Sequence, residues 1–544
     1  MAPLFVGSNS DDSRIRSDRV GLAASTSNPA SADTGDVYYN STDNKLTVYN
    51  GSDWVSAGGG GTLSGIASGA LTDGMPVIIQ SDETIRSVVQ EVNNFSPIGV
   101  GTTNYIQNGS EPKYISVIYN TDRDLHVAFY EDETSNNLKG SVIQVNEDSV
   151  TPSVSTKLVS NRHPSETDAA FIAETSGANA VNAVFYTSGT TLYTMGSLIS
   201  GSMNSMNGAT LTLGSEFSVQ TSTPTTPRCI ATNNTSGRTF VFYIRSADVM
   251  CRGISWSGIT ASHTGGGEQT VTTDSANTLS VAYNGSDKVL IAYDEGSNGK
   301  AVVGTISGEA ISFGSAVTFS TGGAALLGED GVSYDSTLDK FLIVYRDQGD
   351  SEDMKAIVAT VSGTSATFGA ATDVFTDSNN LGNVYYDPVG GRHAIVINDQ
   401  TNDLHKVFMA TISGTSVTVD SGIGVAYLAD QNKRMRLSHD IDQERFLALH
   451  RGNQIQKFEV QSLKTSTITK HLTANNFIGF SDGAYSDGAT ATVQIEGSVD
   501  DAQSGLTTAK THYVQHDGTL STTAGDPSVP AGTAISATKI IIET

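Results

Sequence analysis

Short apolar runs alternate with polar turns along most of the chain, and one arrangement of three runs recurs. Its clearest copy is residues 280–308, where a run ending at Tyr283 precedes a polar turn, the run VLIAY, an acidic loop and the run AVVGTI. Alternating apolar residues bounded by Asn, Gly, Asp and Ser are typical of strands joined in hairpins. The pattern therefore predicts a small antiparallel unit of three strands.

The same unit recurs seven times, at residues 116–145, 171–201, 229–258, 280–308, 331–363, 383–414 and 436–462. The spacings between the residues that end the second runs are 56, 57, 50, 52, 53 and 52, taken from Tyr130, Tyr186, Tyr243, Tyr293, Tyr345, Asn398 and His450. A period of about 40 to 50 residues with three or four strands per unit is typical of a β-propeller. A stacked β-solenoid is the alternative, although solenoid repeats usually have shorter periods. The pattern favours an all-β fold with a seven-bladed propeller.

Most units carry a fourth apolar run, such as residues 310–319, 365–375 and 416–422. If the pattern begins with the second strand of a blade, each fourth run becomes the innermost strand of the next blade. The first blade then lacks an inner strand. Residues 466–470 are predicted to supply it and to close the ring from the far end of the chain.

The regions on either side of the repeats resemble each other, with NNFSPIGVG at residues 93–101 and NNFIGFSDG at residues 475–483. This similarity predicts a propeller inserted into one small β domain, since the ends of an inserted module lie close together. The segment before it is either an arm that becomes ordered against a partner or a frayed terminus. The predicted division is an extended attachment arm at 1–34, a β-hairpin module at 35–57, a Gly-rich linker at 58–66, the first part of the small β domain at 67–110, the propeller at 111–472 and the second part of the small β domain at 473–544.

The charge of the chain excludes some classes of partner. Asp and Glu number 57 against 31 Lys and Arg, which gives a formal net charge of −26. General nucleic-acid binding requires basic surface, so we expect none. No apolar run approaches the roughly 20 residues that cross a bilayer, and the start of the chain lacks the pattern of a secretory signal. We therefore expect no membrane insertion, and delivery by assembly rather than by export.

The motifs of common catalytic and cofactor sites are absent from the sequence. It has no HExxH, no paired CxxC, no GxxxxGK[ST] and no GxSxG. We accordingly predict no catalytic, cofactor-binding or metal-binding residues. The acidic loop at 347–353 offers oxygen ligands for calcium but does not follow the EF-hand order, and we favour a solvated turn. Cys229 and Cys251 lie on the first and third strands of one repeat and are predicted to be free thiols.

The tyrosines that end the second strands either form platforms for stacking sugars or seal the packing between blades, and we favour packing. The loops after those strands differ most in length and charge, and variable loops on rigid strands usually carry binding. The candidate recognition face therefore comprises Tyr130, Arg245, Asp294, Arg346 and Asn398.

Three segments outside the repeats carry a resemblance to a known class of proteins. GDVYYNSTDNKLTVYNGSDWV at 35–55, SGALTDGMPVIIQSDETIRSVV at 68–89 and the block at 475–542 resemble segments of tail-fibre and other structural proteins of tailed bacteriophages, particularly phages of marine bacteria. The resemblance implies a virion protein made in the host cytoplasm, whose N-terminal part attaches to other virion proteins and whose distal part contacts a host-surface glycan or protein. It also implies a homotrimer.

Two alternatives stay open. One is a glycan-degrading tailspike, although the nearest match to the boxes of sialidase-like propellers, at residues 333–341, lacks their glycine and tryptophan. The other is a capsid decoration protein or a tail adaptor. We favour a tail fibre or tail-associated protein without enzymatic activity, in which the propeller recognises the host surface or acts as a spacer.

Overall fold

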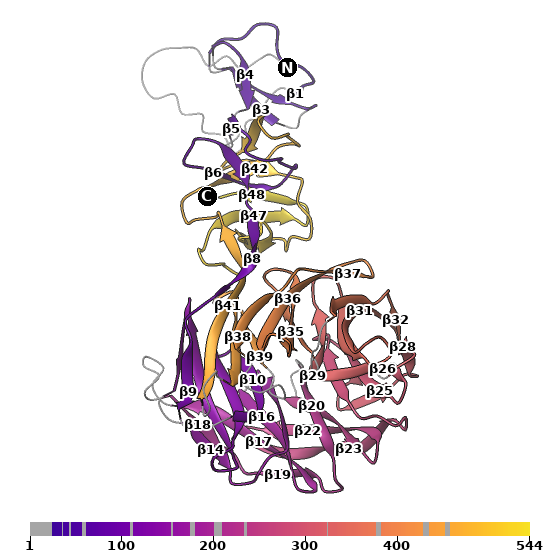
Figure 1. The fold of residues 1–544 in the computed structure, drawn as a ribbon. Coiled ribbons are helices and arrows are strands. Elements are labelled where there is room, and N and C mark those ends of the chain that lie inside the picture. Colours follow the sequence, from indigo (N-terminus) through magenta and orange to yellow (C-terminus); the bar gives the residue numbers. More distant parts are fainter. Residues whose placement is uncertain are drawn as a thin grey trace. The chain divides into compact units, whose positions relative to one another are not determined.

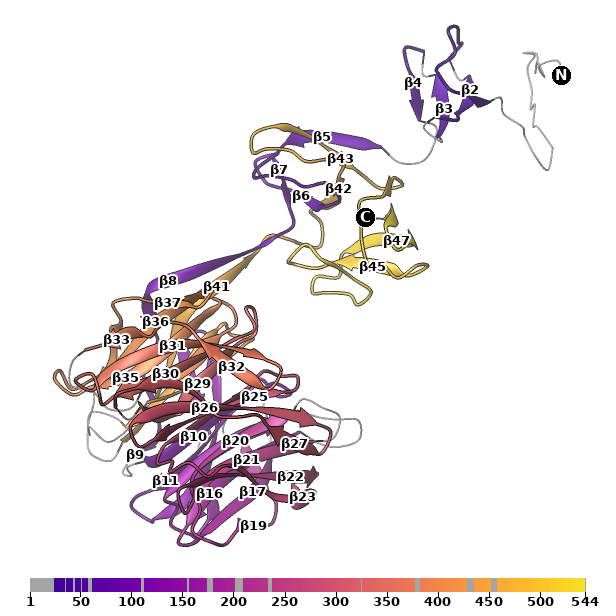
Figure 2. The same cartoon turned by 90° about the vertical axis from the view of Figure 1, so that its right-hand side faces the viewer.

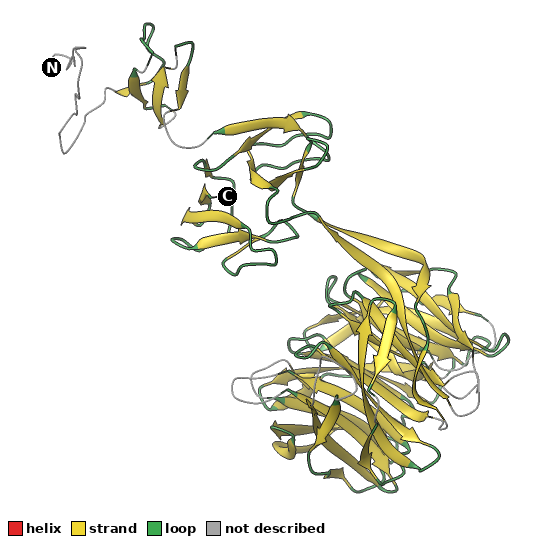
Figure 3. Ribbon diagram, turned by 90° about the vertical axis from the view of Figure 1, so that its left-hand side faces the viewer, coloured by secondary structure: helices red, strands yellow, loops and turns green. Residues whose placement is uncertain are grey.

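The computed structural model describes residues 24–34, 36–42, 45–49, 51–56, 61–108, 112–153, 156–173, 180–200, 209–232, 237–323, 325–376, 382–427, 435–451 and 457–543. Throughout these residues the secondary structure consists of strands, and no helix is present that could cross a membrane (Figure 3). The all-β prediction is confirmed. The chain forms two compact units, unit 1 with Met1–Glu91 and Thr469–Thr544, and unit 2 with Val92–Ile468.

The described part of unit 2 contains seven antiparallel sheets (Figures 1 and 2). Sheets one to three comprise β10 (Pro112–Asn120), β11 (Leu125–Asp132), β12 (Asn137–Asn146), β13 (Ser149–Pro152) and β14 (Lys157–Ser160); β15 (Glu166–Ile172), β16 (Val181–Ser188), β17 (Thr191–Ser200), β18 (Thr210–Leu213) and β19 (Phe217–Gln220); and β20 (Thr225–Thr232), β21 (Arg238–Arg245), β22 (Asp248–Ser257) and β23 (Thr260–Thr272).

Sheets four and five comprise β24 (Leu279–Tyr283), β25 (Lys288–Glu295), β26 (Asn298–Ser307), β27 (Ala310–Phe313) and β28 (Val317–Thr321); and β29 (Ala325–Asp335), β30 (Lys340–Asp347), β31 (Asp353–Ser362), β32 (Ser365–Phe368) and β33 (Thr372–Phe375). Sheets six and seven comprise β34 (Asn383–Asp387), β35 (Arg392–Asp399), β36 (Leu404–Ser413), β37 (Ser416–Val419) and β38 (Ile423–Tyr427); and β39 (Arg436–Asp440), β40 (Arg445–Arg451), β41 (Lys457–Lys470), β8 (Gln90–Val100) and β9 (Asn104–Asn108).

The sheets of unit 2 are arranged in a closed ring. The first strand of each sheet lies beside the first strand of the next, and β39 of the last sheet lies beside β10 of the first. The first strands therefore surround a common axis, and the later strands of each sheet lie farther out (Figure 1). This arrangement is a β-propeller, as the repeat predicted, and not a solenoid.

The fourth run of each repeat stays in its own sheet, so its predicted position at the axis is wrong. In sheet four, β27 pairs antiparallel with β26, with Ser307 opposite Ala310. The two residues between them include Gly308 at φ 59°, a backbone conformation that suits a two-residue hairpin loop. The tight turn folds the chain back against the third strand, which places the fourth run at the outer edge.

The ring is closed by the N-terminal side of the chain, contrary to the prediction for residues 466–470. Those residues are the end of β41, the third strand of sheet seven, and β8 and β9 pair with this strand from the outside (Figure 2). The first sheet needs no donated inner strand because β10 already occupies that position. Sheet seven thus joins strands from before the first repeat to the strands of the last repeat, which ties the ring together without a covalent link.

The second strands form the buried core between sheets. Every residue of β11 is buried, and the tyrosines that end the second strands are at most 2% exposed in five sheets: Tyr130, Tyr186, Tyr243, Tyr293 and Tyr345. The Tyr130 ring meets Phe458 of sheet seven with 4.7 Å between ring centroids. The favoured interpretation of these tyrosines as packing residues is therefore confirmed. In sheet six the strand register places Ile397, not Asn398, at the equivalent position.

Unit 1 contains three sheets among the described residues. The first consists of β1 (Ala24–Ser25), β2 (Val37–Asn40), β3 (Lys45–Tyr49) and β4 (Trp54–Ser56), where the Trp54 ring meets Tyr38 edge-on at 4.8 Å. The second has the order β5 (Thr62–Ile66), β43 (Thr490–Gln494), β42 (Phe477–Ser481), β6 (Pro76–Ile79) and β7 (Ile85–Ser87). The third has the order β44 (Val499–Asp500), β48 (Lys539–Ile542), β47 (Pro530–Ser536), β45 (Thr511–Val514) and β46 (Leu520–Ser521).

The second sheet of unit 1 interleaves strands from both flanks of the repeats, since β43 and β42 lie between β5 and β6. Residues 62–66, predicted to belong to the linker, instead form β5, because they pair along their whole length with β43. Residues 92–110, predicted for the small domain, fall in unit 2, because β8 and β9 complete sheet seven. Residues 1–23 of the predicted arm, residue 57 of the hairpin module and residues 58–60 of the linker lie outside the described residues.

Candidate functional site

The first strands place one equivalent residue from each sheet around the axis. Counted back from the hairpin that joins the first and second strands, these residues are Ser116, Asp168, Arg228, Ser280, Gly331, Asn383 and Arg436. We call this set the axial ring. Three of its members, Asp168, Arg228 and Arg436, are charged, so the propeller axis is a polar site inside the ring of sheets.

A bulge in β29 adds two carboxylates to the axial ring. Between Leu327 and Val332 this strand advances five residues while β30 advances two, from Tyr345 to Ile343, so three residues are extra. Such a bulge redirects side chains out of the regular alternation. Here Glu329 and Asp330 are brought to Arg436 of sheet seven.

All three guanidinium nitrogens of Arg436, and Nε and Nη1 of Arg228, contact groups of the protein. The Arg436 guanidinium lies 2.7 Å from Asp330 Oδ2 through Nη1, pairs with Glu329 through Nη2, and donates through Nε to the Ile115 carbonyl at 3.0 Å. Arg228 donates through Nε to the Leu279 carbonyl at 3.1 Å and through Nη1 to the Pro227 carbonyl at 2.5 Å. The two cations therefore link five of the sheets across the axis.

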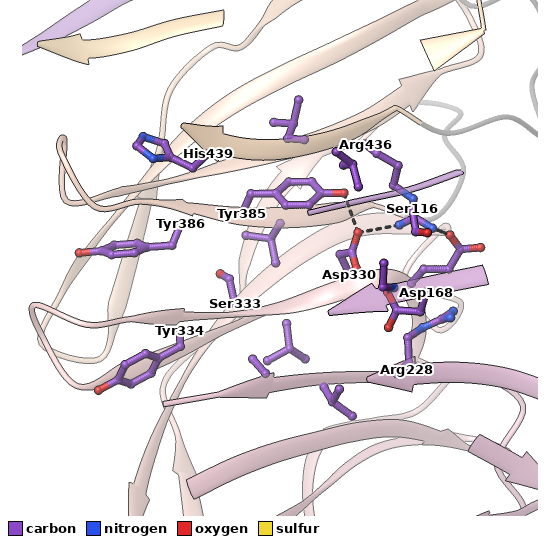
Figure 4. A pocket seen from close by; sticks show the side chains of 18 of the residues that line it. Ser116, Asp168, Arg228, Asp330, Ser333, Tyr334, Tyr385, Tyr386, Arg436 and His439 are labelled. Carbon is purple, nitrogen blue, oxygen red and sulfur yellow. Dashed lines mark hydrogen bonds and ion pairs between the residues drawn. The ribbon is translucent and has the colours of Figure 1, made fainter. Parts of the chain in front are cut away.

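Hydroxyl and amide donors complete this network (Figure 4). Tyr385 donates its hydroxyl to Asp330 Oδ2 at 2.7 Å. Asp168 accepts the backbone N–H groups of Cys229 and Ala169 at 2.7 and 2.9 Å. Hydrogen bonding of this kind is what permits polar groups to be buried.

Burial controls the ionisation of the network. It raises the pKa of Asp168, while the nearby Arg228 and the two backbone N–H groups oppose the shift. Burial, assisted by repulsion from Arg228, lowers the pKa of Arg436 to about 9, so this guanidinium is still protonated at neutral pH. Burial beside Asp330 raises the pKa of Tyr385, so its hydroxyl stays a neutral donor.

A cavity of about 400 Å³ extends along the axis from this network, and all seven first strands line it. The apolar part of its wall includes the residue after each member of the axial ring: Val117, Ala169, Cys229, Val281, Val332, Val384 and Leu437. At its other end lie the half-buried side chains of Tyr283, Tyr334, Tyr386 and His439. Figure 4 shows Tyr334, Tyr386 and His439 at one end, and Arg228, Asp168 and Arg436 at the other.

A second, smaller cavity of about 120 Å³ lies on the opposite side of the charged groups. It shares Arg228 and Glu329 with the larger cavity, and its other lining residues, such as Thr226 and Leu279, precede the axial ring along their strands. The charged network therefore forms a floor, and the tyrosines stand at the mouth of the larger cavity. We call this larger cavity the axial pocket.

Buried imidazoles connect neighbouring sheets close to the mouth. His126 lies 3.1 Å from Ser438 Oγ and 3.3 Å from Asp440 Oδ2, which join sheets one and seven. His393 lies 2.7 Å from Ser333 Oγ and 3.6 Å from Asp335 Oδ2, which join sheets six and five. Burial lowers the pKa of both imidazoles, although the nearby carboxylates oppose the shift.

The recognition face predicted from the sequence does not lie at the axial pocket, and most of it is buried. Tyr130, Asp294 and Asn398 are each 1% exposed. Asp294 accepts the backbone N–H groups of the loop that precedes its sheet, and Asn398 contacts the His405 ring at 2.9 Å. Arg245 pairs with Glu268, and Arg346 lies 3.5 Å from Glu352. The side chains of Tyr130, Asp294 and Asn398 are therefore not available to a ligand at the surface.

The axial residues were not predicted from the sequence, because the fourth run of each repeat was predicted to be the innermost strand. A signal was present, since the first runs ETDAAFI, TTPRCIAT, GEDGVSYD and RLSHD each carry at least one ionisable residue. Once these runs are known to be innermost, an ionisable residue within one of them indicates an axial site.

Two other groups of side chains, a carboxylate cluster and the two cysteines, could bind a metal or react, and their surroundings account for both. Asp350, Asp353 and Asp373 bring carboxylate oxygens within 4.8 Å of one another. However, Lys355 Nζ lies 2.5 Å from Asp350 and 3.4 Å from Asp373, and it neutralises part of this charge. The two cysteines are free thiols, as predicted, with β21 between the strands that carry them.

Comparison with known proteins gives only distant likenesses. No family model and no curated protein matches the chain. Among solved structures, the Aleuria aurantia lectin in complex with Fucalpha1-6GlcNAc is similar at 12% identity over 59% of this chain and 98% of the lectin, with a TM-score of 0.36. The Dos1 propeller is similar at 8% identity over 68% of this chain and 95% of that chain, with a TM-score of 0.39.

A polysaccharide lyase of family PL25, an ulvan lyase bound to a saccharide, is similar at 9% identity over 66% of this chain and 95% of the lyase, with a TM-score of 0.42. Likenesses of this size identify neither a ligand nor a reaction for this chain.

Proposed function

We propose that this chain is a structural protein of a tailed-phage virion, a tail fibre or tail-associated protein, in which a seven-bladed propeller recognises a molecule of the host surface at the axial pocket. Unit 1 serves in this proposal as the attachment part. The proposal for the virion rests on the phage-like segments at 35–55, 68–89 and 475–542. A homotrimer is part of the same proposal, and it rests on that resemblance alone.

One observation supports recognition at the axis, the concave pocket of about 400 Å³ whose polar floor and tyrosine mouth are drawn from all seven sheets. Ligand sites in proteins are typically concave, of roughly 300 to 1,000 Å³, and mostly apolar with a few placed polar groups. The axial pocket is concave and has a volume in that range, and its exposed lining is more polar than apolar. Rigid strands hold every side chain that lines it, so the site is formed before a ligand arrives.

A variant that fills the pocket tests recognition. Ala169 lies on the pocket wall and Ala310 is exposed at the outer edge of sheet four, so Ala169→Trp and Ala310→Trp add the same side chain inside and outside the site. We expect fluorescently labelled Ala310→Trp protein to bind susceptible cells like the parent, and Ala169→Trp to lose most binding with an unchanged melting temperature. Equal binding by both variants would contradict recognition at the axis.

Location and catalysis are tested separately. Gold-labelled antibody against the chain should mark the tail of purified virions, whereas labelling spread over the capsid would support a decoration protein.

Incubation with polysaccharide purified from susceptible cells should release no reducing ends. Their release, lost in Ala169→Trp, would replace this proposal with a tailspike depolymerase.

A further inference from the structure

We infer that the axial pocket selects an uncharged sugar at the end of a glycan chain and discriminates against acidic sugars. This inference rests on the proposed function, in that the pocket is taken as the recognition site. It follows from three properties of the pocket: the engagement of its two guanidinium groups, the balance of its charges, and its charged floor with aromatic groups at the mouth.

Neither guanidinium group presents a fork with both nitrogens free of protein partners, because Arg436 is engaged at all three nitrogens and Arg228 at Nε and Nη1. Proteins bind carboxylates and sulfates most effectively when an arginine donates two parallel N–H groups to the anion. In the axial pocket, Arg436 directs its terminal nitrogens at Asp330 and Glu329, and Arg228 is held by two backbone carbonyls. An acidic ligand would have to displace one of these carboxylates from a site where the Arg436 side chain is only 6% exposed.

The charge balance of the pocket also opposes an anion. Its described lining holds three carboxylates, Asp168, Glu329 and Asp330, and two guanidiniums, Arg228 and Arg436. With these five groups ionised, their net charge is −1. Like charges at short range in a partly desolvated site repel strongly, and the chain as a whole carries −26, so its field also opposes the approach of an anion.

The shape of the pocket favours the end of a chain over its middle. The charged network lies across one end, and the mouth is formed by tyrosines whose hydroxyls are held by turns. Tyr334 donates to Asp339 at 2.9 Å, and Tyr283 donates to the Ser286 carbonyl at 2.6 Å. Apolar ring faces are thus fixed at the entrance, and polar groups at the floor accept and donate hydrogen bonds. A sugar has the matching character, with apolar C–H faces and hydroxyl groups at its rim.

Matched pairs of monosaccharides test the inference. In glucose and glucuronic acid, or galactose and galacturonic acid, the members of a pair differ in one group, CH₂OH against carboxylate. Binding of the methyl glycosides to the full chain is measured by saturation-transfer NMR and titration calorimetry. We expect the neutral member of at least one pair to bind at least tenfold more tightly than its acid, and we expect Ala169→Trp to abolish that binding.

A gain-of-function variant keeps the test independent of misfolding. Val281 lines the pocket, and Val281→Arg places a cation there that no carboxylate yet holds. The matched control is Val499→Arg at an exposed site in unit 1, where Val499 is 44% exposed. Val281→Arg should raise the affinity of the acidic member at least fivefold, and Val499→Arg should leave it unchanged.

The outcomes separate this inference from the proposed function. Tighter binding of the acidic members, lost in Ala169→Trp, would overturn the selectivity and leave axial recognition standing. Absence of binding by every member at tens of millimolar, together with equal cell binding by Ala169→Trp and the parent, would overturn both.

Discussion

The contacts between neighbouring sheets differ in chemistry although their backbone register is the same. Where sheet seven meets sheet one, the residue that ends the first strand is Asp440 and its neighbour across the interface is His126. Where sheet four meets sheet five, the residue equivalent to His126 is Phe341, which packs in an apolar cluster. One interface is therefore joined by a directional polar contact and the other by apolar burial.

The two kinds of interface contribute differently: apolar contacts supply stability, and polar contacts fix the relative geometry of the sheets. Apolar burial stabilises in proportion to the area removed from water and has no preferred direction. A buried imidazole–carboxylate pair contributes little net stability, but it is costly to break from one side, and it has a defined geometry. Imidazole–carboxylate contacts occur at the interfaces of sheets five to six, six to seven and seven to one, the second of them between His439 Nε2 and Asp387 Oδ1 at 3.4 Å. These interfaces border the mouth of the axial pocket, where Ser333 both lines the pocket and contacts His393.

The largest expected effect comes from emptying the apolar interface. Phe341 is 1% exposed, and Phe341→Ala removes a buried ring and leaves a cavity, at a cost of about 4 kcal/mol in the free energy of unfolding. The loss should be the same at pH 7.5 and 5.5, because no titrating side chain is involved. Leu338→Ala, at a site 44% exposed in the neighbouring turn, is the control and should change stability by less than about 0.5 kcal/mol. Denaturant unfolding of the propeller measures both.

The second prediction concerns a phenylalanine, the residue found at the apolar interface, placed in the polar interface of sheets seven and one. His126→Phe gives sheet one the side chain that sheet five carries, but it leaves Asp440 Oδ2 buried without its imidazole. We expect a loss of about 2 to 3 kcal/mol at pH 7.5. Adding Asp440→Asn should recover part of this loss, because it removes the buried charge while keeping an oxygen for the Gln443 backbone N–H. Full stability in His126→Phe alone would mean that the two kinds of interface are interchangeable.

The sequence allowed the fold class to be predicted because alternation and turn residues are local signals. Seven runs of VLIAY type recur at a nearly constant spacing, and their tyrosines are buried between sheets, as expected. The position of each strand within its sheet was harder to predict. The same Ser-Gly turn after the third run can either keep the fourth run in its own sheet or lead it into the next blade. That ambiguity displaced the innermost strand by one position.

The candidate site was not predicted because three-dimensional neighbours in a ring are far apart in the chain. Arg436 meets Asp330 across 106 residues, and only the extra residues of the β29 bulge bring the two together. The variable loops were predicted instead, yet Asp294 at the start of such a loop caps the backbone of the preceding turn. A one-residue error in the sixth repeat also exchanged Ile397 for Asn398.

The polar interfaces should make the propeller sensitive to acid. Burial lowers the pKa of His393 in the folded chain below its usual 6.5, although Asp335 and Asp387 oppose the shift. The unfolded chain therefore binds more protons just below pH 6.5, and the stability that is complete above this pH falls as the pH is lowered toward the folded pKa. Each such histidine costs at most about 1.4 kcal/mol per pH unit.

We therefore expect the difference in stability between pH 7.5 and 5.5 to shrink by up to about 1.4 kcal/mol in His393→Phe. His405 and His450 are also buried with lowered pKa values, so some acid sensitivity should remain. An unchanged pH dependence in His393→Phe would show that the pKa of the His393 imidazole is the same in the folded and unfolded chain.

The smallest expected effect is at the interface of sheets one and two, which is polar but uncharged. There Asn182 occupies the position of His126, and its Oδ1 accepts a hydrogen bond from Asn120 Nδ2 at 2.9 Å. Asn120→Ala should cost about 1 kcal/mol, the net worth of one buried hydrogen bond between neutral groups. Because amides do not titrate, the cost should be equal at pH 7.5 and 5.5. A cost that grows in acid would show that Asn120 acts through the nearby His126–Asp440 pair, and the interfaces of sheets one to two and seven to one would then have to be treated as one coupled polar network.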